Sequence, residues 1–232
     1  HCSKPGSLEL ASRICNSASD STGGAVGASL FLEQGYLGMS FNNYQSHYGT
    51  VAEDQVSIGM RSNHAALEGE WRPDSRLFQQ LNFQASQTDY LHTEFDAGAP
   101  GTVFTNKGHD VRVQLRHKPW HTGAGTWDGV WGLQAEHAQF SAMGEEAFAP
   151  FSNTRTKALF LFESYSVAEL QFNVGGRKEA VTVESLGNPD PSVDRFLLGM
   201  RQFSPQSMAA SASWQTLPQW RLSTSLSHVQ RA

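Results

Sequence analysis

The feature that most constrains the fold is a strict alternation of apolar and polar residues in the segment FTNKGHDVRVQLRHKPW, residues 104–120. Its central residues alternate as Val111, Val113 and Leu115 against Arg112, Gln114 and Arg116. Successive side chains of a β-strand point to opposite faces, so this segment predicts a strand with one apolar face and one polar face. A soluble sheet over a core has such faces. So does a membrane barrel, in which the apolar face contacts lipid and the polar face lines a wet lumen.

The same alternation recurs along the chain. The alternating segments are 25–32, 36–43, 64–72, 77–90, 111–116, 131–136, 157–163, 168–177 and a hairpin within 207–227. Glycine and aromatic residues are abundant, and long helical patterns are few. The sequence therefore predicts an all-β protein with an antiparallel sheet of about ten strands.

The predicted connections alternate between short and long. Short connections are predicted at 33–35, 72–76, 118–126, 164–168 and 217–219, and long ones at 44–56, 93–106, 141–154 and 184–204. Outer-membrane barrels have short periplasmic turns and long extracellular loops, whereas a soluble β-sandwich has no reason to place its long loops at one end. Aromatic residues also gather near the short turns, as expected at a membrane interface: Tyr36, Trp71, Trp120, Trp127, Tyr165 and Trp220.

Composition excludes several other classes. No run of eighteen apolar residues is present, so a transmembrane helix is not expected. The net charge is −5 and no basic patch occurs, which argues against nucleic acid as a partner. The chain has no G-x-S-x-G, H-E-x-x-H, Walker A or G-x-G-x-x-G motif, so it is not expected to be an enzyme.

Three architectures stay open from the residues alone. The first is a middle segment of a larger transmembrane barrel, the second is a closed barrel of about ten strands, and the third is a secreted soluble β-sandwich. The two cysteines, Cys2 and Cys15, either form a disulfide that closes a surface loop or remain free thiols. We expect the disulfide, which would indicate an oxidising compartment.

Several segments together resemble the TonB-dependent outer-membrane receptors, and among them the zinc-uptake receptors of the ZnuD type. They are GYLGMSFNNYQSHYGTVAEDQVSIGMRSNHAALEGEW, TDYLHTEFD, FTNKGHDVRVQLRHKP, SAMGEEAFAP and QWRLSTSLSHVQRA. The resemblance implies a barrel of about 22 strands filled by a plug. Residues 1–232 would then be part of that barrel domain, without the plug and the remaining strands.

The resemblance also implies a function. The protein would import zinc across the bacterial outer membrane, surrounded by lipid and driven through its plug by the TonB energy-coupling complex. Zinc would be the transported substrate, and no catalytic cofactor is expected. The alternatives are a TonB-dependent receptor for haem or for a metal chelate or siderophore, and a passive porin-like barrel.

Candidate zinc ligands lie in the segment 64–70. His64, Glu68 and Glu70 share its polar face, and zinc is bound by His, Cys, Asp and Glu side chains. The resemblance implies that Glu70 is the barrel carboxylate, with partners from the plug and from a barrel segment beyond Ala232. The alternative is that Glu68 and Glu70 solvate a polar lumen and pair with Arg112 or Arg116.

Other candidates are weaker. His92 and Glu94 are two residues apart, so both side chains point the same way on a strand and could form an entry site for a metal. His1 with Cys2 could belong to a metal-capturing loop, and Glu145 and Glu146 are expected in an extracellular loop. Haem would need axial His or Tyr, for which His47 and Tyr48 are the candidates. The remaining histidines are expected to have no such role: His109, His117, His121, His137 and His228.

Overall fold

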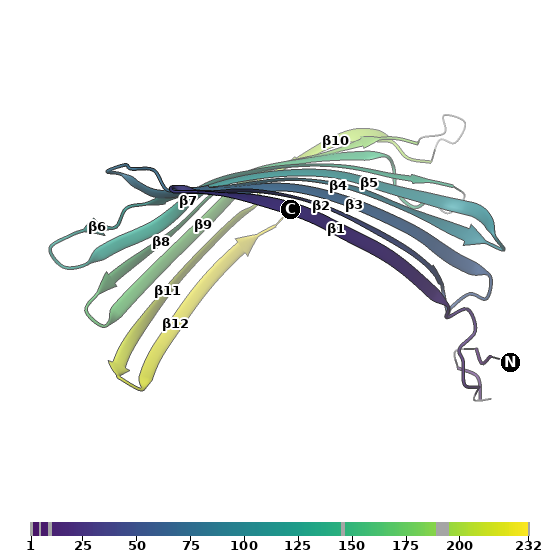
Figure 1. Ribbon diagram of the computed structural model, residues 1–232, viewed down its shortest axis with the longest axis horizontal. Coiled ribbons are helices and arrows are strands. Elements are labelled where there is room, and N and C mark those ends of the chain that lie inside the picture. The colour runs from purple at the N-terminus through teal and green to yellow at the C-terminus, as the bar shows by residue number, and fades with distance from the viewer. Residues whose placement is uncertain (1, 5, 9–10, 145–146, 189–194, 232) are drawn as a thin grey trace.

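The computed structural model describes residues 2–4, 6–8, 11–144, 147–188 and 195–231, which form one antiparallel sheet (Figure 1). The strands are β1 (Ser19–Leu32), β2 (Gly35–Gly49), β3 (Val56–Trp71), β4 (Phe78–Asp96), β5 (Ala99–His117), β6 (Trp120–His121), β7 (Thr126–Met143), β8 (Ser152–Val167), β9 (Leu170–Leu186), β10 (Leu198–Phe203), β11 (Gln206–Leu217) and β12 (Trp220–Gln230). No helix of the described residues is long and apolar enough to span a membrane.

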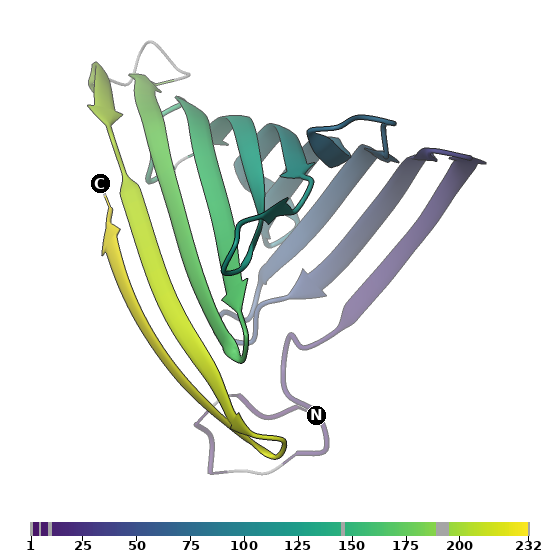
Figure 2. The same cartoon turned by 90° about the vertical axis from the view of Figure 1, so that its left-hand side faces the viewer.

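The sheet is an open, curved wall. Ten strands pair in the order β1-β2-β3-β4-β5-β7-β8-β9-β11-β12, while β6 pairs only with β7 and β10 only with β9. Figure 2 shows β12 and β1 at the two edges, on opposite sides of the curve. These edge strands make no contact with each other in the described chain, so the alternative of a closed barrel of about ten strands is wrong.

The two faces of the sheet differ as the alternation predicts. The apolar residues of one face are exposed, and Leu133 and Leu159 keep 60% and 58% of their accessible surface. The polar side chains of Arg112 and Gln114, on the other face, are half-buried. Side chains crowd on the concave side of a curved sheet and diverge on the convex side. We therefore call the polar, concave side the inner face and the apolar, convex side the outer face.

The strands are longer than a bilayer requires. A transmembrane strand needs about 9–11 residues, whereas β4 and β5 each have 19. The apolar residues of the outer face lie in the halves of the strands near the predicted short turns, for example at Val111–Leu115 in β5. We call that side the short-turn end and the opposite side the loop end. The other half of each strand continues beyond the apolar band toward the loop end.

This continuation corrects the predicted long loop at 93–106. β4 and β5 are joined by Ala97 and Gly98 alone, with φ of 48° and 84°. Positive φ at both central residues is the requirement of the two-residue hairpin turn that matches the twist of paired strands. The sequence around this turn contains the acidic residues, threonines and glycines of a typical loop but belongs to two paired strands.

The other connections are shorter than predicted for the same reason. The described strands leave 50–55, 144–151 and 187–197 as connections at the loop end, and β10 occupies part of the predicted 184–204 loop. At the short-turn end, β8 extends to Val167, so the predicted 164–168 turn is only 168–169. The remaining short turns lie close to the predicted positions, and the 118–125 turn contains β6.

The N-terminal segment is fastened to the loop end of the sheet. Cys2 and Cys15 form the expected disulfide, with their Cα atoms 5.0 Å apart. The Asn16 side chain donates hydrogen bonds to the carbonyl oxygens of Glu53 at 2.7 Å and Val56 at 2.6 Å. This segment therefore packs beside the β2–β3 connection. The bonded Cys2 has no free thiolate for a metal, and its predicted partner His1 lies outside the described residues.

Candidate functional site

Glu70 lies on the inner face near the short-turn end of β3, as predicted. The strand register places it between Tyr36 of β2 and Asn82 of β4. Its Oε2 accepts a hydrogen bond of 2.8 Å from Gln80 Nε2, and its Oε1 lies 2.5 Å from Arg72 Nη2. Glu70 is therefore a half-buried carboxyl group held between an amide and a guanidinium group.

Glu68 shares a depression of the inner face with Glu70. The depression has a volume of about 310 Å³ and is also lined by Arg112 and Gln114. Gly38 lies opposite Glu68, and a Cβ there would lie 3.6 Å from Glu68 Cγ. A second depression of about 360 Å³ shares Arg112 and Gln114 with the first, so the two adjoin each other at β5.

His64 does not join these carboxylates. Its Nδ1 lies 2.8 Å from the Thr88 hydroxyl on β4. Six residues of extended strand separate His64 from Glu70, which corresponds to about 20 Å. The polar face of β3 thus orders its predicted ligands along a line instead of gathering them at one point.

His92 and Glu94 form a separate pair, still farther toward the loop end. They face inward opposite Met60 and Ile58, with His92 Nε2 3.6 Å from Glu94 Oε1. The Tyr90 hydroxyl lies 3.2 Å from His92 Nδ1, and the Phe104 ring packs on the imidazole with 4.6 Å between centroids. The two residues point the same way, as predicted, but supply only two potential metal ligands.

The five predicted ligands are therefore not one site of this chain. Among the described residues, no three His, Cys, Asp or Glu side chains come close enough to hold a metal ion. A metal at Glu70 or at His92 would need ligands from elsewhere in a larger protein. Glu145 and Glu146 lie outside the described residues.

Two other predictions are corrected by the strand register. Arg116, a predicted partner for the glutamates, instead donates from Nε to Asp128 Oδ1 at 3.0 Å. Its predicted partner Glu70 contacts Arg72. His47 faces outward and Tyr48 inward, because adjacent residues of β2 alternate. These two residues therefore cannot both ligate one haem from the same side of the wall.

An aromatic and cationic cluster of the inner face was not predicted. The Arg112 guanidinium lies over the Phe160 ring at 4.6 Å, and that of Arg177 approaches the same ring at 5.8 Å. Arg177 also donates to Glu179 and to Gln134. The Phe160 ring lies over Gly132 of β7, where a Cβ would be 2.1 Å from the ring. The only signal in the sequence was the presence of arginines on polar strand faces.

The outer face has a polar cluster near the short-turn end that was also missed. His117 is 1% exposed, and its Nε2 lies 3.1 Å from Glu163 Oε2. The other carboxylate oxygen of Glu163 accepts a hydrogen bond of 2.7 Å from Trp131 Nε1, and the Trp120 ring stacks on His117 at 4.3 Å. His117 is thus a buried histidine with protein partners, a structural contact that its sequence context did not predict.

Comparisons with known proteins agree with this geometry. No family model matches the chain. The ferric citrate transporter FecA matches 91% of the chain with a TM-score of 0.69 and 13% identity, the chain covering 36% of it. The ferric-catecholate import receptor Fiu from E. coli K12 matches 92% at 0.69 and 12% identity, with 47% covered. The copper transporter OprC matches 92% at 0.66 and 9% identity, with 37% covered.

The fold is an all-β antiparallel sheet that matches barrel segments of these proteins. The chain spans less than half of the length of each of these three proteins. In every case the match extends over nearly all of this chain, so the open curved sheet resembles part of each of these larger proteins. A soluble β-sandwich, the third architecture left open by the sequence, does not describe this single sheet.

Proposed function

We propose that this chain is part of the wall of a TonB-dependent receptor that imports a metal across the bacterial outer membrane. The observation that carries the proposal is the single curved sheet with an exposed apolar outer face and a polar inner face. The similar solved structures are TonB-dependent outer-membrane receptors, which supports the placement in that membrane. The rest of the barrel, of about 22 strands, and a plug coupled to TonB would complete the receptor.

Zinc is the cargo we propose first. Glu68 and Glu70 face the inner depression, where carboxylate oxygens are available on the side that a plug would occupy. Carboxylates ligate zinc in sites completed by histidine, and the further ligands would come from outside this chain. Arg72 and Gln80 contact the two oxygens of Glu70 and fix the orientation of this potential ligand.

A metal chelate is the second candidate, and the cluster around Phe160 favours it. Two guanidinium groups over one aromatic ring make a surface that suits an anionic, planar ligand. Arg112 lines both inner depressions, so the same wall could contact a chelate much larger than a bare ion. The metal of a chelate is already ligated by the chelator, so the protein would not have to supply three metal ligands.

The test is calorimetry on the full-length receptor refolded in detergent, with zinc as ligand and cobalt and haem as competitors. Zinc-preferring binding that weakens by more than about tenfold in Glu70→Ala is expected for a zinc receptor. The matched control is Glu136→Ala, an inward carboxylate on β7 that accepts a hydrogen bond from Gln134.

The outcomes separate the two cargoes. Equal zinc affinity in the Glu70 variant and the wild type would remove Glu70 from the site. No zinc binding by a folded receptor would contradict zinc as cargo and direct the search to chelates. In that case a Phe160→Leu receptor should bind the correct chelate more weakly than the wild type.

A further inference from the structure

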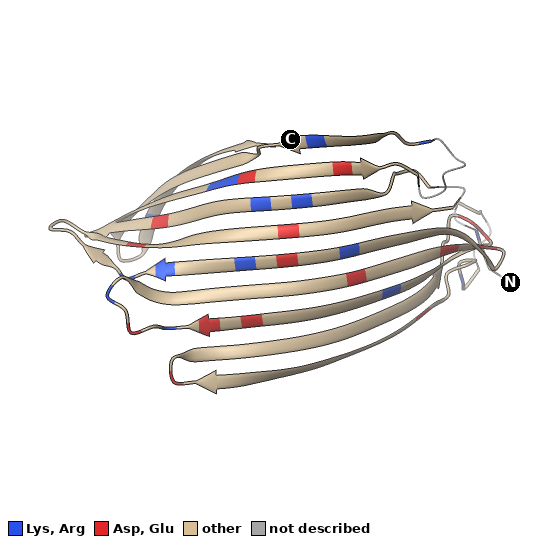
Figure 3. Ribbon diagram, turned by 90° about the horizontal axis from the view of Figure 1, so that it is seen from above, with Lys and Arg blue, Asp and Glu red and all other residues tan. Residues whose placement is uncertain are grey.

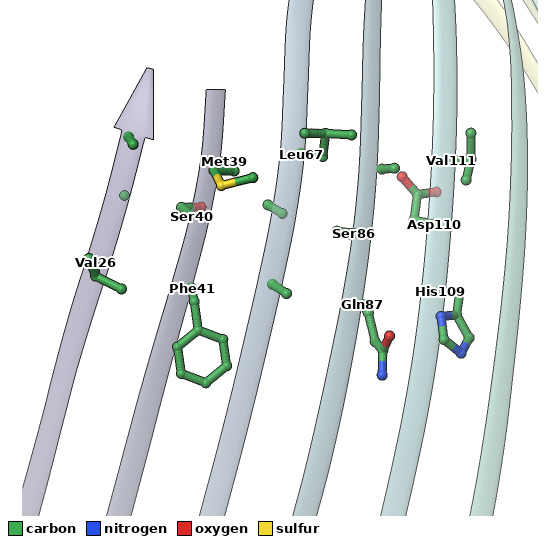
Figure 4. Close-up of a pocket in the computed structure, with 15 residues that line it drawn as sticks. Val26, Met39, Ser40, Phe41, Leu67, Ser86, Gln87, His109, Asp110 and Val111 are labelled. Carbon is green, nitrogen blue, oxygen red and sulfur yellow. The ribbon is translucent and has the colours of Figure 1, made fainter. Parts of the chain in front are cut away.

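The outer face carries an apolar groove at the edge of its apolar band that is nearer the loop end. The groove has a volume of about 630 Å³, which lies in the range of about 300–1,000 Å³ found for small-molecule sites. Figure 4 shows Met39, Leu67 and Val111 in one row across neighbouring strands, with Phe41 and His109 in the next row. The groove therefore runs across β1–β5 between two rows of outward side chains.

The floor of the groove is low because its residues are small. In the register, Ala28 lies opposite Met39, Leu67 opposite Ala85, and Ala65 opposite Phe41. Large side chains thus alternate with alanines across the strands. A flexible apolar chain could lie against these alanines and contact the sides of Phe41 and Leu67.

One end of the groove leads to a group of cationic and imidazole side chains. His109 lines the groove and stacks on His137 of β7, with 6.4 Å between ring centroids and 22° between planes. Arg155 of β8 is the register partner of His137. Lys157 follows on the same face, about 7 Å along the strand. We call Arg155 and Lys157, together with the stacked imidazoles of His109 and His137 beside them, the cationic rim.

Cationic side chains outnumber acidic ones around this rim. On the outer face of β5, β7 and β8 toward the loop end, none of the described residues is Asp or Glu. On the adjoining β9, Lys178 and Glu184 face outward, and Glu184 is two residues from Thr182, the register partner of Arg155. The ion pairs of the described chain involve neither Arg155 nor Lys157, and both side chains are exposed. Along the middle strands, Lys and Arg positions are interspersed with Asp and Glu positions when both faces are counted (Figure 3). Neighbouring unpaired cations repel one another, and a bound anion would offset that repulsion.

We propose that the groove and the cationic rim together bind one phosphate-bearing anionic lipid of the outer leaflet. The headgroup phosphate contacts Arg155 and Lys157 beside the stacked histidines, and an acyl chain lies in the groove. Lys157 is two residues from Leu159 of the apolar band, which puts the rim at the depth of lipid headgroups. The inference rests on the proposed placement in the outer membrane, and it adds a lipid site that metal import does not require.

The test is native mass spectrometry of the full-length receptor in a neutral detergent. The probes are phosphatidylglycerol and phosphatidylcholine with identical acyl chains, and folding is checked by the heat-dependent shift of gel mobility. We expect the wild type to prefer phosphatidylglycerol, and the preference to fall about fivefold for each cation removed in Arg155→Gln and Lys157→Gln. The matched control, Arg76→Gln with Lys118→Gln, removes two exposed cations at the short-turn end and should keep the preference.

Two further measurements keep the proposal open to contradiction. Ala65→Phe should fill the groove and weaken binding of both lipids while the charge preference remains. Millimolar inorganic phosphate should not displace the lipid, because it gains nothing from the groove; complete displacement would indicate a phosphate site without a lipid. Equal binding of the two lipids by a folded receptor would overturn the proposal. So would an unchanged preference for phosphatidylglycerol when Arg155→Gln and Lys157→Gln are combined. Metal calorimetry on the same samples distinguishes the two failures. Metal binding without the lipid preference would contradict only the lipid site, whereas loss of metal binding would contradict the proposed function.

Discussion

Glu70 and Glu163 are carboxylates of the same sheet that face opposite sides, and their surroundings differ accordingly. Glu70 on the inner face is held by Gln80 and Arg72, polar neighbours of a wet wall. Glu163 on the outer face contacts the buried His117 and the Trp131 indole. A polar group on the inner wall can exchange partners with water, whereas on the outer wall it must be fully partnered and covered by aromatic rings.

The largest effect on the outer-face pair His117–Glu163 is expected from a substitution at Gly129. It lies between the strands that carry His117 and Glu163, and a Cβ there would lie 2.3 Å from Glu163 Oε2 and 2.5 Å from the Phe162 carbonyl oxygen. Gly129→Ala should therefore separate the ion pair and destabilise the barrel by about 4 kcal/mol. The measurement is urea unfolding of the full-length receptor in lipid vesicles.

The control for that variant is Gly108→Ala in β5. A Cβ at Gly108 meets no atom within 4 Å, so the substitution should change the free energy of unfolding by less than about 1 kcal/mol. Equal effects at the two glycines would mean that the space above Gly129 is not needed for the ion pair.

Replacing each carboxylate by an amide compares the two walls directly. Glu163→Gln leaves His117 buried without its anionic partner and should cost about 3 kcal/mol. Glu70→Gln keeps a hydrogen-bonding group at a wet wall and should cost less than about 1 kcal/mol, while metal binding weakens. Unfolding midpoints and zinc calorimetry on both variants test the pair. A larger loss of stability at Glu70 than at Glu163 would reverse the contrast.

Phe160→Leu should have a small effect on stability. It removes the ring beneath Arg112 and Arg177 but keeps an apolar side chain, so we expect a loss of about 1 kcal/mol. The control is Phe172→Leu on the outer face, where the ring faces the lipid side of β9. Indistinguishable unfolding curves for the Phe160 variant and the wild type would show that the cation–ring contacts do not stabilise the inner wall.

The faces of the strands could be predicted from the sequence, because alternation has a period of two and needs no partner. Val113 and Gln114 are on opposite faces of β5 as expected. The strand ends could not be predicted in the same way. Beyond the apolar band, strands such as β4 lose the strict alternation and contain the polar residues that are typical of loops. The sequence therefore predicts a long loop at 93–106, where the structure has a hairpin.

The candidate sites were predictable only as residues on a face. Glu68 and Glu70 face inward as expected, and His92 and Glu94 share one face as expected. The distance that separates the two pairs along the strands does not follow from the face on which each residue lies. The His117–Glu163 pair and the Arg112–Phe160 contact join strands β5 and β8, with β7 between them. Such contacts require the register of three strands, which no local pattern contains.

The central claim is that the outer face contacts lipid and the inner face contacts water. Spin labels placed singly at residues 111–116 of the full-length receptor in lipid vesicles test it directly, because the two natural cysteines are paired in a disulfide. Labels at Val111, Val113 and Leu115 should be accessible to oxygen, which partitions into lipid, and those at Arg112, Gln114 and Arg116 to a water-soluble nickel chelate. A uniform response along the segment, or alternation with the opposite phase, would contradict the account.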